Sequence, residues 1–78
     1  MPKKDFEKVR SHRKGLFAYR LLKVYMEANG FVEKSINGSH HIWQTPDGMI
    51  FSVPVHSGEV KACYVKSIRN WIEKNLET

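Results

Sequence analysis

Four histidines are the side chains in this sequence that can carry acid–base chemistry near neutral pH. An imidazole titrates in that range, so it can take up and return a proton under cellular conditions. His40 and His41 are adjacent, and His56 lies in a loop ahead of the last helical pattern. We interpret His12, in a basic N-terminal segment, as solvated surface. The other three histidines are the candidate catalytic residues.

The direction of each side chain on a strand separates His40 from His41. Neighbouring strand residues point to opposite faces. Ile42 is the natural core residue of this segment, so we expect His41 and Trp43 to point outwards and His40 to face the helices. An outward His41 beside an exposed Trp43 suits RNA, because the indole can stack a base while the imidazole meets the sugar-phosphate. The alternative is ordinary strand histidines, with Trp43 in a partner interface.

Other kinds of site find less support in the sequence. A zinc site needs three or four converging nitrogen or sulfur ligands, and adjacent strand histidines cannot readily hold one ion. We therefore expect no metal and no other cofactor. The single cysteine, Cys63, excludes an internal disulfide and is typical of a small buried hydrophobe. His56 could bind or protonate a phosphate near a helix N-terminus, or could simply close its loop.

The positive charge is concentrated near the N-terminus. The 78 residues carry a net charge of +5, and residues 1–23 alone hold eight basic and two acidic side chains. A basic face attracts polyanions, of which nucleic acid is the usual one, whereas the alternative is a solvated helix face. This length suits one domain, residues 1–78, with 1–15 as a basic extension. Because no apolar run approaches ~20 residues and no secretory signal is visible, we expect a cytoplasmic protein without a membrane partner.

The spacing of the hydrophobic residues, which predicts the elements that position these side chains, changes along the chain from a helical to a strand period. Helical spacing predicts a helix over residues 16–29, ended by Asn29-Gly30, and a weaker pattern predicts one over 5–14. Strands are expected at 31–36, 39–45 and 49–53, with turns at Asn37-Gly38 and Pro46-Asp47-Gly48, and a last helix at 61–75. The order predicts an α+β fold, α-β-β-β-α, in which a three-stranded antiparallel sheet packs against two helices.

An ordered set of segments resembles the HicA family of toxins, also called YcfA-like proteins. The segments are Gly38-Ser39-His40-His41-Ile42-Trp43, Pro46-Asp47-Gly48 and Val53-Pro54-Val55-His56-Ser57-Gly58-Glu59. The resemblance covers roughly residues 16–72. It implies a toxin of a type II toxin–antitoxin system that is a metal-independent mRNA interferase, with a fold similar to double-stranded RNA-binding domains. It also implies a HicB-type antitoxin that covers the active face.

Carried over by position, the resemblance implies that His41 is the catalytic histidine, because it ends the Gly-Ser-x-His element. Lys61 then matches a basic position at the start of the last helix, where a phosphate contact is expected. Arg20, Lys23 and Trp43 complete the expected RNA-binding set. His56 is a candidate general acid, and His40 is the less favoured catalytic histidine.

Two other functions remain open at this point. The first is a non-catalytic RNA-binding module with the same fold and basic segment. The second is a protein-interaction domain that uses Trp43 and Trp71 as anchors. The enzyme is favoured because the histidine-bearing segments are present as well as the fold. Since catalysis would use the RNA 2′-hydroxyl, we expect cleavage of RNA and not of DNA.

Overall fold

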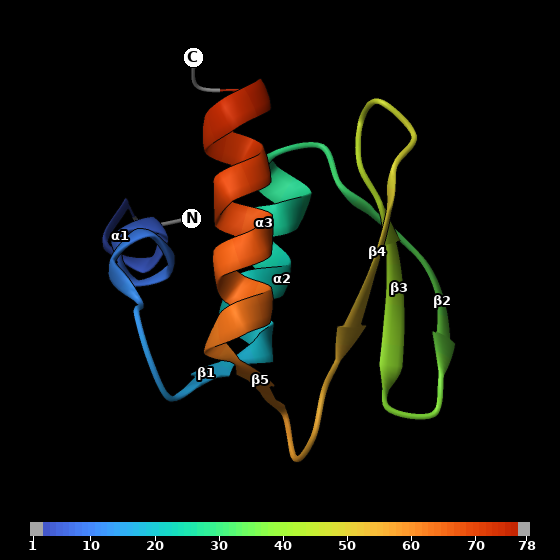
Figure 1. Ribbon diagram of the computed structural model, residues 1–78, viewed down its shortest axis with the longest axis horizontal. Coiled ribbons are helices and arrows are strands. Elements are labelled where there is room, and N and C mark those ends of the chain that lie inside the picture. The colour runs from blue at the N-terminus through green and yellow to red at the C-terminus, as the bar shows by residue number, and fades with distance from the viewer. Residues whose placement is uncertain (1–2, 77–78) are drawn as a thin grey trace.

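A three-stranded antiparallel sheet stands beside three helices in the computed structural model, which describes residues 3–76 (Figure 1). In chain order the elements are α1 (Lys3–Ser11), β1 (Leu16–Ala18), α2 (Tyr19–Ala28), β2 (Val32–Asn37), β3 (His40–Gln44), β4 (Ile50–Pro54), β5 (Glu59–Lys61) and α3 (Ala62–Asn75). The predicted α+β class and the β2-β3-β4 sheet are confirmed. No helix within residues 3–76 is long and apolar enough to cross a membrane.

The hairpin between β2 and β3 forms at the predicted turn. Asn37 pairs with His40, so Gly38 and Ser39 make a two-residue loop. Gly38 has a φ of +63°, the sign that the first loop position of a type II′ turn requires. Farther along, the register shifts between Glu33 and Ser35, which leaves one extra residue on β2. This β-bulge bends the strand next to Glu33.

A second sheet of two short strands was not expected from the sequence. β1 pairs with β5, which joins Phe17 to Val60 across the chain. The predicted helix at 16–29 therefore begins later, at Tyr19. Its end is confirmed, because Gly30 adopts a φ of +87° after the last turn.

The loop around His56 is a tight hairpin. His56 and Glu59 exchange both backbone hydrogen bonds, at 3.0 and 2.9 Å, and the two loop residues between them have positive φ. The loop residues are Ser57, at 53°, and Gly58, at 74°. The Gly58 carbonyl also accepts a hydrogen bond from the backbone N–H of Tyr19 at 2.9 Å. The histidine hairpin is thus fastened to the start of α2.

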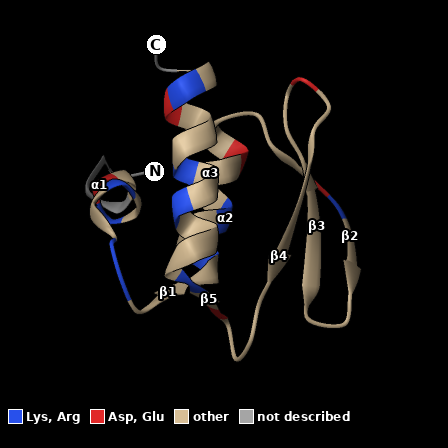
Figure 2. Cartoon of the chain, in the orientation of Figure 1, with Lys and Arg blue, Asp and Glu red and all other residues tan. Residues whose placement is uncertain are grey.

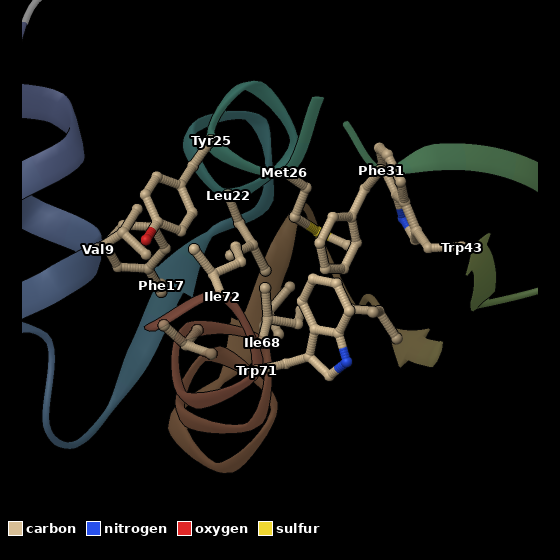
Figure 3. Close-up of a cluster of buried hydrophobic side chains, with 13 residues drawn as sticks. Val9, Phe17, Leu22, Tyr25, Met26, Phe31, Trp43, Ile68, Trp71 and Ile72 are labelled. Carbon is tan, nitrogen blue, oxygen red and sulfur yellow. The ribbon is translucent and has the colours of Figure 1, made fainter. Parts of the chain in front are cut away.

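The hydrophobic core lies between the helices and the inner face of the sheet (Figure 3). Its buried residues are Val9, Phe17, Leu22, Tyr25, Met26, Phe31, Trp43, Val53, Val60, Val65, Ile68, Trp71 and Ile72. Trp43 is fully buried, so it cannot anchor a partner as the interaction-domain hypothesis requires, whereas Trp71 is 9% exposed and lines a surface hollow. The expectation that Cys63 is buried is also wrong, because it lies on the exposed side of the first turn of α3.

The N-terminal segment packs onto the domain. Val9 of α1 is fully buried, and Phe6 contacts the ring of Tyr25 edge-on at 5.3 Å. His12, expected to be solvated, is half-buried against Phe17 with ring centroids 4.9 Å apart. Burial of apolar surface therefore contributes to holding α1 against α2 and α3.

Candidate active site

His41 and Trp43 face the helices, which reverses the predicted orientation of β3. Trp43 is fully buried, and His41 pairs across β4 with the buried Val53. Ile42 and His40 lie on the opposite face, where His40 is exposed and 3.4 Å from the Ser52 hydroxyl. Trp43 rather than Ile42 occupies the inner face because an indole buries more apolar surface, and because its N–H has a hydrogen-bond partner in the interior. That partner is the hydroxyl of Tyr19, at 3.0 Å.

The ring of His41 lies at the rim of the inner face and is held on two sides. Its Nδ1 is 2.9 Å from Oε2 of Glu33 on β2, and each of these two side chains is 17% exposed. The ring of Tyr19, at the start of α2, lies 4.5 Å from the imidazole, centroid to centroid. No hydrogen bond within residues 6–76 involves Nε2 of His41. Among these residues, one ring nitrogen is therefore bound to the protein and the other makes no hydrogen bond.

Glu33 is the point at which these contacts meet. The Tyr19 hydroxyl donates to Oε2 at 2.5 Å, on the same oxygen that faces His41. The other oxygen, Oε1, lies 3.6 Å from Nζ of Lys23, one turn farther along α2. The carboxylate thus joins side chains from α2, β2 and β3 in one cluster.

The electrostatics of the cluster favour an ionised Glu33. Burial alone would raise the pKa of Glu33, but the hydrogen bonds from Tyr19 and His41 and the charge of Lys23 lower it below its usual value of 4.5. The pKa of Tyr19 is raised well above 10.0, by burial first and then by its bond to Glu33. The lowered pKa of Glu33 and the raised pKa of Tyr19 both reflect one contact, in which a neutral phenol donates to a carboxylate.

The remaining predicted site residues fall into a second group. His56 and Lys61 line one surface hollow of about 310 Å³, together with Leu16, Pro54, Glu59 and Tyr64. Arg20 is exposed on the first turn of α2, beside Tyr19. Trp43 has no exposed face on which to stack a base, so the expectation that it binds RNA by stacking is wrong. The lysines and arginines lie on and around the helices, and Lys34 alone stands on the three-stranded sheet (Figure 2).

A protein-family model matches most of the chain. The model described as the HicA toxin of bacterial toxin-antitoxin systems matches residues 20–75. The chain belongs to the HicA toxin family. No curated protein and no solved structure matches it significantly. Membership makes the chain a toxin and implies an antitoxin as its partner. All of β2, β3, β4 and α3 lies inside the matched segment, whereas α1 and β1 precede it.

In this HicA toxin, sequence reasoning missed Glu33 and Tyr19. Glu33 is the single acidic residue between positions 28 and 46, and it lies on the strand that pairs with the histidine strand. In a regular hairpin closed by Asn37 and His40, however, Glu33 would oppose Gln44 and face away from His41. The bulge after Glu33 places it opposite Trp43 instead, on the inner face. A lone carboxylate near the histidines was a visible signal, but the bulge was not.

Proposed function

We propose that this HicA toxin is a metal-independent endoribonuclease, an mRNA interferase that stops translation in the cytoplasm, with His41 as its general base. The observation that carries the proposal is the contact between Nδ1 of His41 and the Glu33 carboxylate. A carboxylate can only accept, so Nδ1 holds a proton, and in the neutral ring Nε2 then presents a lone pair. A neutral imidazole with a free nitrogen is suited to take a proton from an RNA hydroxyl.

The reaction that fits these groups is an internal transesterification. Nε2 of His41 takes the proton of the 2′-hydroxyl, whose oxygen attacks the adjacent phosphorus. The bond from phosphorus to the 5′-oxygen breaks, and a 2′,3′-cyclic phosphate forms. The leaving 5′-oxygen takes a proton from a general acid, for which His56 is the candidate. Proton transfer of this kind contributes about 10²–10⁴-fold to a rate. DNA has no 2′-hydroxyl and is not a substrate.

Basic side chains near both histidines support an RNA substrate. Lys61 lines the same hollow as His56. Arg20 is exposed on the first turn of α2, next to Tyr19, whose ring contacts His41. We assign phosphate contacts to these two basic residues, where a cation also stabilises charge that develops on the phosphate. Lys23 belongs to the expected RNA-binding set, but its Nζ already lies 3.6 Å from the Glu33 carboxylate. We therefore assign it no phosphate contact.

The proposed protein partner is a HicB-type antitoxin that covers the face carrying His41. Its binding would keep RNA from Nε2. A complex purified from co-expression should therefore leave RNA intact, and release of the antitoxin should restore cleavage.

The test is digestion of single-stranded RNA by the wild type, His41→Ala and His40→Ala, each with and without EDTA. His40 is a matched control, since it is the neighbouring histidine on the opposite face. We expect EDTA-resistant cleavage by the wild type and His40→Ala, none by His41→Ala, and no cleavage of DNA of the same sequence. If folded wild-type protein binds RNA but leaves it intact, the basic N-terminal third points to a non-catalytic RNA-binding module instead.

A further inference from the structure

We infer that Glu33 is a positioning residue that fixes both the tautomer and the ring orientation of His41. The inference rests on the proposed function, because it assigns a second residue to the same reaction. It concerns a side chain that belongs to no recognisable motif in the sequence. It is carried by the hydrogen bonds around Glu33, taken one at a time.

The direction of each proton in the cluster follows from the donors and acceptors present. The indole N–H of Trp43 can only donate, so the Tyr19 oxygen accepts it at 3.0 Å. The single hydroxyl hydrogen of Tyr19 is then directed to Oε2 of Glu33. Because Oε2 accepts there as a carboxylate oxygen, its contact with His41 requires a proton on Nδ1. One arrangement of protons satisfies all three contacts.

The cluster is anchored in the core and cannot easily rearrange. Trp43 is fully buried, and its side chain lies between the helices and the sheet (Figure 3). Lys23 holds the second oxygen of Glu33 from α2. The carboxylate is thereby fixed from two elements before it meets His41. A second residue that orients an imidazole in this way commonly changes activity by tenfold or more when it is removed.

Few other charged groups face His41. From α2 come Tyr19, which is neutral, and Lys23, which pairs with Glu33; Glu27 acts on Tyr19 through its charge. The residue opposite on β4 is Val53, which carries no charge. Among the described side chains, Glu33 is therefore the carboxylate in contact with the ring.

The test is Glu33→Gln, which keeps the shape of the side chain and removes its charge. We expect kcat for RNA cleavage to fall by at least about tenfold while KM changes less than about twofold, because Glu33 acts on the base and not on the substrate. In long-range ¹H–¹⁵N spectra, neutral His41 of the wild type should be protonated at Nδ1. In Glu33→Gln that preference should be lost, since an amide can donate as well as accept.

Two variants guard the interpretation. Glu73→Gln makes the same charge change at an exposed position of α3 and should leave both readouts unchanged. Glu33→Asp keeps the charge and should retain more activity than Glu33→Gln. Should Glu33→Gln fail to fold, the wild-type spectrum decides, because protonation at Nε2 of neutral His41 overturns the inference.

The outcomes separate this inference from the proposed function. If wild type does not cut RNA, the nuclease proposal fails, and the spectra alone then judge whether Glu33 fixes the tautomer. If wild type and Glu33→Gln cut RNA with equal kcat and share one tautomer, the nuclease proposal stands and the role of Glu33 is wrong.

Discussion

The guanidinium of Arg69 on α3 donates to the carbonyl oxygen of His12 at 2.7 Å, across 57 positions of sequence. It also donates to the carbonyl of Val9 at 3.2 Å, near the end of α1, and Arg69 as a residue is 6% exposed. The last carbonyls of a helix have no partners within the helix, and a cation there is favourable. Arg69 thus ties to the domain a segment that precedes the family match.

Replacement of Arg69 by methionine should destabilise the fold by about 2–4 kcal/mol, because one buried and one partly buried carbonyl lose a charged donor. Urea denaturation gives the free energy of unfolding. Lys66→Met, on the exposed side of the same helix, is the control and should change it by less than about 0.5 kcal/mol. Equal stability of Arg69→Met and wild type would show that α1 is held by Val9 and its apolar neighbours alone.

Trp43→Phe should lower the free energy of unfolding by about 1–3 kcal/mol, since Tyr19 loses a donor and the smaller ring leaves space in the core. The affinity for RNA should stay within about twofold of wild type, because the indole is fully buried. Denaturation and RNA titration check the two statements. A large loss of affinity in a folded Trp43→Phe protein would contradict the inward orientation.

The raised pKa of Tyr19 predicts a loss of stability in alkali. Burial and the bond to Glu33 favour the neutral phenol in the folded state, while the unfolded value is 10.0. The stabilisation is therefore complete below pH 10 and is lost as pH rises from there towards the folded pKa. Urea midpoints between pH 8 and 11 should fall less steeply for Tyr19→Phe than for wild type. Parallel curves would remove Tyr19 as the cause.

The lowered pKa of Glu33 predicts the opposite dependence in acid. Although burial opposes it, the donors Tyr19 and His41 and the charge of Lys23 favour the ionised form in the fold. The stabilisation is complete above the unfolded value of 4.5 and is lost as pH falls through the folded pKa. Glu33→Gln should therefore show a shallower decline of the urea midpoint below pH 4.5. Glu73→Gln should follow the wild-type curve.

Lys61→Ala should weaken RNA binding and reduce its dependence on salt. A lysine that contacts one phosphate of a single strand contributes about 0.7 to the slope of log affinity against log salt. Lys74, at the far end of α3, is the control and should leave the slope unchanged on substitution to alanine. Fluorescence anisotropy with a labelled RNA at several salt concentrations gives both slopes. Identical slopes for Lys61→Ala and wild type would remove Lys61 from the RNA interface.

Local signals in the sequence were enough to predict the main sheet and the two long helices. Gly30, the Gly38 hairpin and the Pro46 turn each act within a few residues, so their patterns survive in the fold. β1 and β5 escaped prediction because three residues show no clear alternation, and because their pairing joins Leu16 to Lys61 across most of the chain.

The candidate site was predicted in part. The position of His41 came from a resemblance of local segments, whereas its direction was inferred from Ile42 and is wrong. Ile42 and Trp43 are bulky neighbours on one strand that cannot both face the core. Which of them is buried depends on the hydroxyl of Tyr19, 24 residues away from Trp43. Such contacts leave no periodic trace in the sequence.

The bulge on β2 makes the site sensitive to chain length as well as to residue type. Lys34 is the extra residue, and its removal would let Glu33 and Ser35 follow one another in a regular strand without changing which residues oppose them on β3. A residue added on the hairpin side of the bulge is not compensated in this way. It would push Glu33 one step along the ladder and turn its carboxylate to the opposite face from His41. A one-residue deletion at 34 and a one-residue insertion after Ile36 thus separate spacing from composition, with all the side chains of the cluster still present.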